Sequence, residues 1–215
     1  MRVLSLVGVL FLMSPSWAGD PAPVKLNFAK AKVGELPAGW KSGVTGKAEG
    51  SVWKTVEDKT APDGPLVLAQ TSKNPGPVFN LCVFEGGKYK DVDISIAFKA
   101  VAGKNDQGGG IVWRLQDNNN YYIVRVNPLE DNFRFYKVVD GKRTELVSKE
   151  AKVEAGKWHT MRVVHKGNKI QCYLNGKLLI ETTDDTFPQA GKFGLWTKAD
   201  AQTYFADIQI TAKKE

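Results

Sequence analysis

Hydrophobic and polar residues alternate with a period of two along most of the chain, which is typical of half-buried β-strands. The clearest example is the segment 91–101, in which Val92, Ile94, Ile96 and Phe98 alternate with polar or small residues. Similar segments, separated by turn-forming residues, lie at 24–28, 51–56, 66–71, 79–84, 158–165, 169–174, 178–182, 192–197 and 203–211. No segment has a helical period of useful length. The pattern predicts an all-β, antiparallel sandwich or barrel in a single domain.

The segment 108–141 contains two tight turns that predict how its strands pair. Asparagine tolerates the positive φ of two-residue hairpins, so the Asp-Asn-Asn-Asn sequence at 117–120 predicts position 116 opposite 121 and position 114 opposite 123. The connection at 128–131 then places Phe133 opposite Val126 and Phe135 opposite Val124. The Asp140-Gly141 turn sets position 136 opposite 145. Because side chains alternate along a strand, this register assigns each of them to one of two faces.

One predicted face is apolar and the other is rich in arginine and tyrosine. The apolar face is the predicted core and consists of Ile111, Trp113, Leu115, Tyr122, Val124, Val126, Phe133 and Phe135. The opposite face is the candidate ligand-binding surface and carries Arg114, Gln116, Tyr121, Arg125, Asn127, Arg134, Tyr136 and Glu145. Trp196 alternates with Leu195, so we expect it to point away from the core and to extend this polar face.

Two interpretations of the arginines stay open. In the first, they lie on a solvated sheet and Glu145, diagonal to Arg134, compensates charge, an arrangement that stabilises by about 0–1 kcal/mol. In the second, Arg125 lies directly opposite Arg134 and would repel it, so an oxygen-rich ligand bridges the two through bidentate hydrogen bonds. The aromatic residues Tyr121, Tyr136 and Trp196 are likewise either packed side chains or platforms on which a sugar ring stacks.

The N-terminus has the features of a secretory signal, namely Arg2, an apolar run at 3–13 and the sequence Ser-Trp-Ala at 16–18. We therefore expect cleavage after Ala18 and a periplasmic or secreted domain of residues 19–215. The apolar run is too short for a membrane span, and no other segment approaches the roughly 20 apolar residues required. The formal net charge is +7, but it is dispersed, which argues against nucleic-acid binding and favours a general attraction to acidic surfaces.

The cysteines and histidines do not predict a reactive or metal-binding site. Cys82 and Cys172 could form a disulfide in an oxidising compartment, but Cys172 alternates with Ile170 and Leu174, which favours a free buried thiol. His159 and His165 lack a third ligand nearby, so no metal site is predicted. The oxygen atoms at 117–120 could bind Ca²⁺, although a turn is the simpler explanation of these residues, and no cofactor is expected.

Three segments of the second half, NNYYIVRVNPLEDN, GKWHTMRVVHKGNKIQCYLNGKLL and AGKFGLWTKAD, resemble the concanavalin A-like lectin/glucanase superfamily. Within it, the chain is most similar to the bacterial exported domains grouped with 3-keto-disaccharide hydrolases, relatives of family 16 glycoside hydrolases and laminin G-like domains. The resemblance covers residues 25–211. It implies a jelly roll of two stacked antiparallel sheets with saccharides bound in the groove of the concave one, for which the polar face is the candidate.

The sequence says less about catalysis than about binding. The Glu-x-Asp-x-x-Glu strand of catalytic family 16 enzymes does not occur here, so their mechanism does not transfer. Hydrolysis usually needs two carboxyl groups about 5–5.5 Å or 6.5–9.5 Å apart, and Asp117 and Glu145 are the candidates near the groove. A 3-keto sugar could instead be cleaved by elimination, which needs one base and one electrophile. The sequence thus predicts a saccharide-binding domain and leaves open whether it hydrolyses a glycosidic bond of a 3-keto disaccharide or glucoside. The alternative is a non-catalytic glycan-recognition or adhesion module of the cell envelope.

Overall fold

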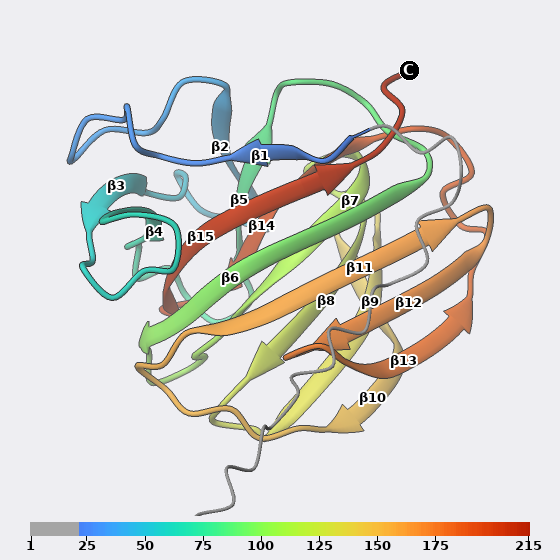
Figure 1. Ribbon diagram of the computed structural model, residues 1–215. Helices are drawn as coiled ribbons and strands as arrows, with labels where there is room; N and C mark the ends of the chain where they lie inside the picture. The colour runs from blue at the N-terminus through green and yellow to red at the C-terminus, as the bar shows by residue number, and fades with distance from the viewer. Residues whose placement is uncertain (1–21) are drawn as a thin grey trace, which may run out of the picture.

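The computed structural model describes residues 22–215 and contains two antiparallel β-sheets packed face to face (Figure 1). The first sheet consists of β1 (Val24–Leu26), β3 (Trp53–Glu57), β4 (Leu66–Gln70), β6 (Val92–Ala102), β11 (His159–Lys166), β12 (Lys169–Leu174), β13 (Lys177–Thr183) and β15 (Gln202–Thr211). The second sheet consists of β2 (Trp40–Thr45), β5 (Phe79–Phe84), β7 (Gly109–Asp117), β8 (Asn120–Asn127), β9 (Asn132–Val139), β10 (Lys142–Glu150) and β14 (Lys192–Lys198).

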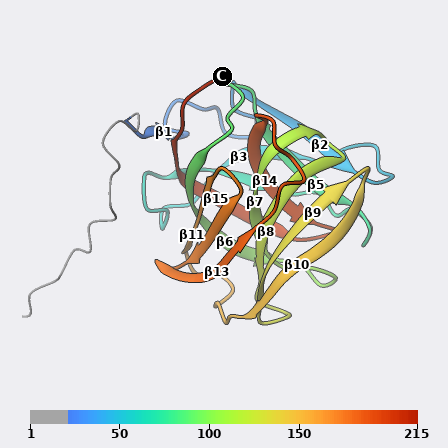
Figure 2. The same cartoon turned by 90° about the vertical axis from the view of Figure 1, so that its right-hand side faces the viewer.

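The order of the strands gives the jelly-roll sandwich that the sequence predicts. The first sheet runs β13-β12-β11-β6-β15-β4-β3, with β1 added to β15, and the second runs β10-β9-β8-β7-β14-β5-β2. Figure 2 shows β11 and β13 of the first sheet on one side of the sandwich and β8, β9 and β10 of the second on the other. Within residues 22–215 there is no helix long and apolar enough to cross a membrane. The predicted signal peptide, 1–18, lies outside the described residues and stays a prediction.

The main core fills the space between the sheets. Trp113 and Phe135 stack with their ring centroids 5.6 Å apart, and Tyr122 packs against Phe135 at 5.7 Å. The indole nitrogen of Trp113 donates a 2.9 Å hydrogen bond to Nδ1 of His165 on the opposite sheet. Burial lowers the pKa of His165 to about 3, so this histidine is a neutral acceptor inside the core.

Both cysteines are buried in the same core and are free. Cys82 lies on β5 of the second sheet and Cys172 on β12 of the first. This confirms the expectation drawn from the alternation around Cys172, and burial raises the pKa of both thiols. The two side chains therefore behave as small apolar groups.

The pairing of β8 with β9 and of β9 with β10 follows the prediction, but most of β7 is shifted by two residues relative to β8, so the predicted pairs 114–123 and 116–121 do not form. Phe133 lies opposite Val126, Arg125 opposite Arg134 and Tyr136 opposite Glu145. In the first hairpin, however, Val112 pairs with Ile123 and Asp117 pairs with Asn120, so a bulge lies between positions 113 and 117. Arg114 sits in this bulge with φ of 45°.

The bulge places Arg114 away from the predicted polar face. Its guanidinium group is buried and donates hydrogen bonds to the carbonyl oxygens of Lys90 (2.9 Å), Phe187 (2.8 Å) and Gly167 (2.7 Å). Leu115, predicted to face the core, instead packs on the other side of the sheet. Placing Arg114 on the ligand-binding face was wrong, because a bulge shifts the alternation of all residues within it.

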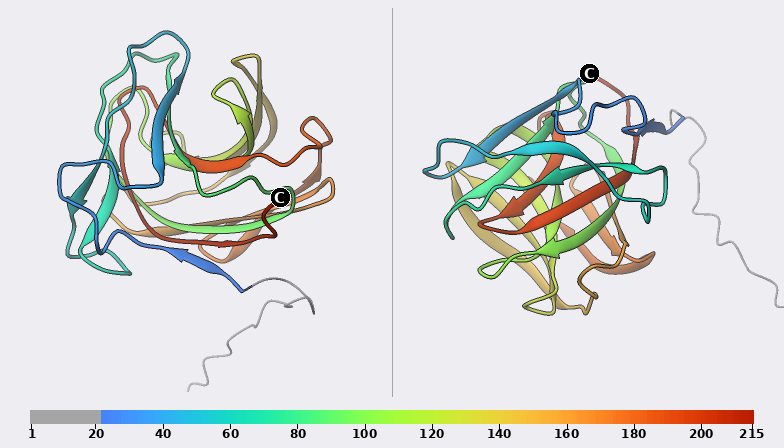
Figure 3. Two further views of the ribbon diagram at one scale, coloured as in Figure 1. Left: turned by 90° about the horizontal axis from the view of Figure 1, so that it is seen from above. Right: turned by 90° about the vertical axis from the view of Figure 1, so that its left-hand side faces the viewer.

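The second sheet is strongly curved. In the left view of Figure 3, β2 rises on one side of this sheet and β9 and β10 rise on the other, so that the face turned away from the main core is concave. The end of β2 touches the β7–β8 hairpin, where the hydroxyl of Thr45 hydrogen-bonds to the carbonyl oxygen of Asn118 and to the hydroxyl of Tyr121. The second sheet thus has a concave outer face in addition to the face that lines the main core.

Candidate functional site

The concave face carries its own apolar cluster, separate from the core between the sheets. Its members, which come from β5, β7, β8, β9 and β14, are Phe79, Leu81, Val83, Val112, Leu115, Tyr121, Ile123, Tyr136, Val138 and Trp196. Tyr121 and Trp196 are fully buried, and only 3% of Tyr136 is exposed. These three residues therefore lie on the predicted face, but in this structure their rings are packed and do not form open platforms for a sugar.

Arg143 on β10 covers part of this apolar cluster. The carbon atom at the centre of its guanidinium group lies 4.4 Å from the ring centroid of Tyr136, 5.0 Å from that of Phe79 and 5.9 Å from that of Trp196. Phe79 belongs to β5, on the opposite side of the curved sheet. Arg143 therefore reaches across the concave face and shields the rings beneath it.

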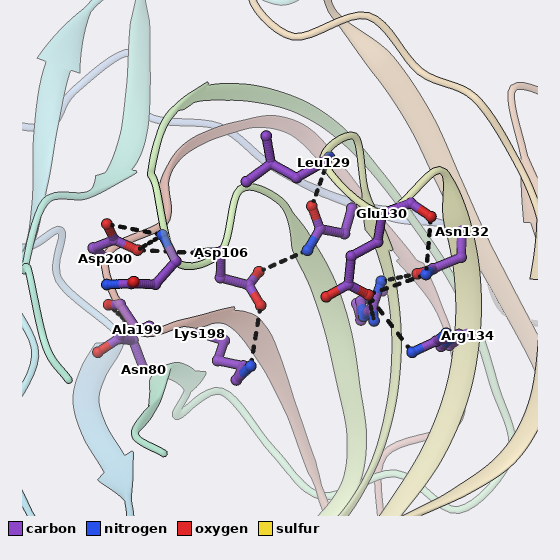
Figure 4. Close-up of polar contacts among 12 residues, drawn as sticks. Asn80, Asp106, Leu129, Glu130, Asn132, Arg134, Lys198, Ala199 and Asp200 are labelled. Atoms are coloured by element: carbon purple, nitrogen blue, oxygen red, sulfur yellow. Dashed lines mark hydrogen bonds and ion pairs between the residues drawn. The ribbon is translucent and has the colours of Figure 1, made fainter. Parts of the chain in front are cut away.

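Charged side chains gather on this face and on the loops beside it, and we call Asp106, Arg125, Glu130, Arg134 and Lys198 the polar cluster (Figure 4). The strands bring only part of it together, because Arg125 and Arg134 are paired on β8 and β9. Glu130 comes from the β8–β9 connection, Asp106 from the loop before β7, and Lys198 from the end of β14. Five separate segments thus contribute one ionic side chain each.

Glu130 resolves the repulsion expected between the two paired arginines. Its Oε2 atom lies 2.8 Å from Nη2 of Arg125 and 3.6 Å from Nη1 of Arg134. Partial burial raises the pKa of Glu130, but hydrogen bonds from Asn132 and the charge of Arg125 outweigh it and hold the pKa below its usual value. Arg125 also donates to the hydroxyl of Tyr136 at 3.0 Å. The carboxylate that bridges the arginines is therefore the protein's own.

Asp106 and Lys198 form the other half of the polar cluster. The ammonium nitrogen of Lys198 lies 3.4 Å from Oδ2 of Asp106, and the amide of Asn127 donates to Oδ1 at 3.3 Å. Burial raises the pKa of Asp106, and the charges of Lys198 and Arg125 oppose this shift. Asn127, predicted as a ligand contact, is buried and instead supports Asp106.

Two side chains hold this half of the site in place. The carboxylate of Asp200 accepts hydrogen bonds from the backbone nitrogens of Lys104 (2.9 Å), Asn105 (3.0 Å) and Asp106 (3.1 Å). Asn80 donates to the carbonyl oxygen of Ala199 at 3.1 Å, where the backbone has a left-handed φ of 53°. The loop carrying Asp106 and the turn following Lys198 are therefore fixed to the sheet (Figure 4).

The remaining predicted site residues lie outside the polar cluster. Gln116 is exposed and donates to the carbonyl oxygens of Arg114 and Ala190. Asp117 accepts hydrogen bonds from the backbone of Asn119 and the amide of Asn120, so it stabilises the hairpin turn. Glu145 lies 3.3 Å from Nε of Arg134. Asp117 and Glu145, the candidates for a catalytic pair, thus belong to separate local networks.

Sequence reasoning missed Asp106, Glu130 and Lys198. Each lies in a connection or at the end of a strand, where alternation carries no information about direction. The detectable signal is that all three lie in or directly beside the connections 103–107, 128–131 and 199–201, which adjoin strands of the polar face. No group of three or more His, Cys, Asp or Glu side chains suited to a metal occurs within residues 22–215, and calcium binding stays untested.

Solved structures share this fold at low sequence identity. The carbohydrate-binding module CBM66 from Bacillus subtilis is 18% identical with a TM-score of 0.66, over 81% of this chain and 96% of that one. A putative glycosyl hydrolase from Parabacteroides distasonis is also 18% identical, with a TM-score of 0.54, over 82% of this chain and 89% of that one. At 18% identity, these similarities show a shared fold.

Sequence comparisons relate the chain to carbohydrate-active proteins. A levanase from Bacillus subtilis is 24% identical over 160 residues, which is 73% of this chain but only 22% of the levanase. Residues 34–211, which include all strands of the concave face, match the 3-keto-alpha-glucoside-1,2-lyase-like domain as a sequence family. This match covers well over half of the chain, and its span agrees with the resemblance seen in the sequence. The chain therefore belongs to the 3-keto-alpha-glucoside-1,2-lyase-like domain family.

Proposed function

We propose that this domain binds a saccharide at the polar cluster on the concave face. The observation that carries the proposal is a layered arrangement of charge. The side chains of Glu130, Arg134 and Lys198 are 39%, 32% and 23% exposed, whereas those of Asp106 and Arg125 are 3% exposed. The outer three groups can meet a ligand, and the inner two fix their positions.

The outer groups suit sugar hydroxyls. A carboxylate accepts hydrogen bonds from hydroxyl groups, while the cations of Arg134 and Lys198 donate to sugar oxygens, and charged groups make the stronger hydrogen bonds. Rigid placement on strands and anchored loops reduces the entropy lost on binding. Membership of a family described by a glucoside-cleaving activity, and the fold shared with a carbohydrate-binding module, support a saccharide ligand.

Calorimetric titration of the protein with neutral glucan and levan oligosaccharides tests this function. We expect Arg134→Ala to weaken binding by about ten-fold or more, since a hydrogen bond to a charged group contributes roughly 1.5–3 kcal/mol. Arg162→Ala is the matched control, because Arg162 also pairs with a carboxylate, that of Asp93, but lies on the other sheet. Equal weakening by both variants, or no binding by the unaltered protein, would contradict the proposal.

Cleavage of the glycosidic bond in a 3-keto disaccharide or glucoside is a second function that the site supports. The specific observation is an ionised carboxylate, Glu130, next to the partly exposed cation of Arg134. In a 3-keto sugar the C3 carbonyl acidifies the proton on C2. Glu130 would take that proton, and Arg134 or Lys198 would stabilise the enolate oxygen. The C1–O bond would then break to give a C1=C2 double bond, and the departing oxygen would take up the proton held by Glu130, which releases the alcohol and restores the carboxylate.

Following alcohol release from 3-keto-glucosides separates the enzyme from a non-catalytic recognition module. We expect the unaltered protein to release the alcohol and Glu130→Gln to lose this activity by about 10²–10⁴-fold, the range for a general base. Glu145→Gln should keep it, because Glu145 reaches the site only through Arg134. Sugar binding without any turnover would leave a glycan-recognition module as the function.

We also propose that the protein is exported to the periplasm or secreted, with cleavage after Ala18. The support is the charged, apolar and small-residue order of the first 18 positions. Terminal sequencing of the protein from its natural cells should begin at Gly19, and a mature chain that keeps residues 1–18 would contradict export by this signal.

A further inference from the structure

Arg143 differs from the cations of the polar cluster in having no carboxylate partner among the described residues. Arg125 and Arg134 lie against Glu130, and Lys198 lies against Asp106. Within residues 22–215, no Asp or Glu oxygen lies within 4 Å of Arg143, and its guanidinium donors have no hydrogen-bond acceptor. Its contacts are the rings of Tyr136, Phe79 and Trp196.

These rings hold the guanidinium group without using its donors. A cation above aromatic faces is attracted by the ring quadrupole, most strongly where water is excluded. Tyr136 and Trp196 are almost fully buried, so the cation is partly dehydrated on the side that faces them. Its in-plane N–H groups are left for another acceptor, and Arg143 itself is partly exposed.

The position of Arg143 connects it to the polar cluster. Tyr136 carries Arg143 on its ring face at 4.4 Å and accepts a 3.0 Å hydrogen bond from Arg125 at its hydroxyl. Tyr136 thus contacts both Arg143 and the polar cluster, which is the proposed sugar-binding site. A ligand lying over the polar cluster can therefore place a substituent at Arg143.

We propose that Arg143 is a specificity-determining residue that binds the carboxylate of an acidic saccharide, such as a uronic acid residue. This inference rests on the proposed saccharide-binding function. The planar guanidinium group forms two parallel hydrogen bonds with a planar carboxylate, which a neutral hydroxymethyl group cannot match. The formal net charge of +7 for the chain also favours the approach of an anionic ligand.

The test compares methyl β-glucuronide with methyl β-glucoside, which differ only in the carboxylate at C6, by titration at low ionic strength. We expect the unaltered protein to bind the glucuronide about ten-fold more tightly or better. In Arg143→Gln this preference should fall to within about two-fold, while affinity for the glucoside stays the same. Arg162→Gln, on the other sheet, is the control and should keep the full preference.

Each other outcome has a defined meaning. Equal affinity of the unaltered protein for both glycosides overturns the inference alone if the glucoside still binds in an Arg134-dependent way, whereas failure of both to bind overturns the proposed function as well. A preference that survives Arg143→Gln also overturns the inference. Equally tight binding of glucose 6-sulfate would replace the carboxylate site with a general anion site.

A second variant keeps the test decisive if Arg143→Gln does not fold. Arg143→Lys keeps the positive charge but lacks the planar pair of donors. We expect its preference for the glucuronide to be clearly smaller than that of the unaltered protein. An undiminished preference in Arg143→Lys would rule out bidentate recognition at this position.

Discussion

Replacing Glu130 by glutamine tests whether one carboxylate holds the two paired arginines together. Glutamine keeps the length of the side chain and an oxygen acceptor, but removes the charge that faces Arg125 at 2.8 Å and Arg134 at 3.6 Å. A hydrogen bond to a charged group stabilises by about 1.5–3 kcal/mol, and a neutral one by about 0.5–1.5 kcal/mol. Because Glu130 is 39% exposed, we expect a loss of about 1–1.5 kcal/mol in the free energy of unfolding.

Thermal and urea unfolding at pH 7 measure this loss. For a domain of this size each kcal/mol lowers Tm by about 2–4 °C, so Glu130→Gln should melt about 2–6 °C lower. Glu145→Gln is the matched control, because within residues 22–215 the carboxylate of Glu145 pairs with Arg134 alone and both side chains are partly exposed. It should change the free energy of unfolding by less than about 0.5 kcal/mol.

The pH dependence of the same difference provides an independent check. The pKa of Glu130 in the folded protein lies below the ordinary value of 4.5, so its stabilisation is present above that value and is lost as the pH falls through the folded pKa. The gap between the unaltered protein and Glu130→Gln should therefore narrow as the pH falls below 4.5. Equal stability of Glu130→Gln and Glu145→Gln, or a gap unchanged at pH 3, would refute the bridging role of Glu130.

Two further predictions concern the interior. Arg114→Ala removes the donor to three carbonyl oxygens and should lower the free energy of unfolding by about 3–5 kcal/mol. Urea unfolding measures this loss, with Gln116→Ala as the control. A loss under about 1 kcal/mol would contradict the prediction. Because burial lowers the pKa of His165 to about 3, the unfolded chain takes up a proton near pH 6.5 that the folded protein does not, so stability should fall as the pH drops from about 6.5 towards 3. His165→Gln should flatten this slope between about pH 6.5 and 5, above the range of most carboxylates, and an unchanged slope would exclude the histidine as its cause.

Alternation in the sequence predicts most of this fold, because burial on one side of a strand leaves a pattern of period two. The bounds of β5 and β12 agree with the prediction at both ends. Strand β2 was missed, since Lys41, Ser42 and Gly43 follow a turn and provide no apolar alternation. It joins the sheet through pairing with β5, a tertiary contact that local sequence does not encode.

Less of the candidate site than of the fold can be predicted from the sequence. Register places Arg125, Arg134, Tyr136 and Glu145 on one face correctly, because hairpin turns determine pairing. It does not reveal that the face is curved and packed, which buries Tyr121 and Trp196. Curvature arises from twist and bulges summed over the whole sheet, and loop residues such as Asp106 acquire their place only through remote partners.

The contacts of the hairpin tip at 117–120 with Thr45 and Gly141 also bear on self-association of the protein. Strands β2 and β10 are the outer strands of that sheet, and exposed outer strands can pair with strands of another molecule. The hairpin tip at 117–120 blocks one end of both, since Asn118 hydrogen-bonds to Thr45 and the backbone of Asn119 to Gly141. An irregularity between Glu145 and Val147 further interrupts β10, and Lys142 and Lys149 add charge to it. The hairpin tip, the irregularity and the lysines thus disfavour edge-to-edge pairing of this sheet with another molecule.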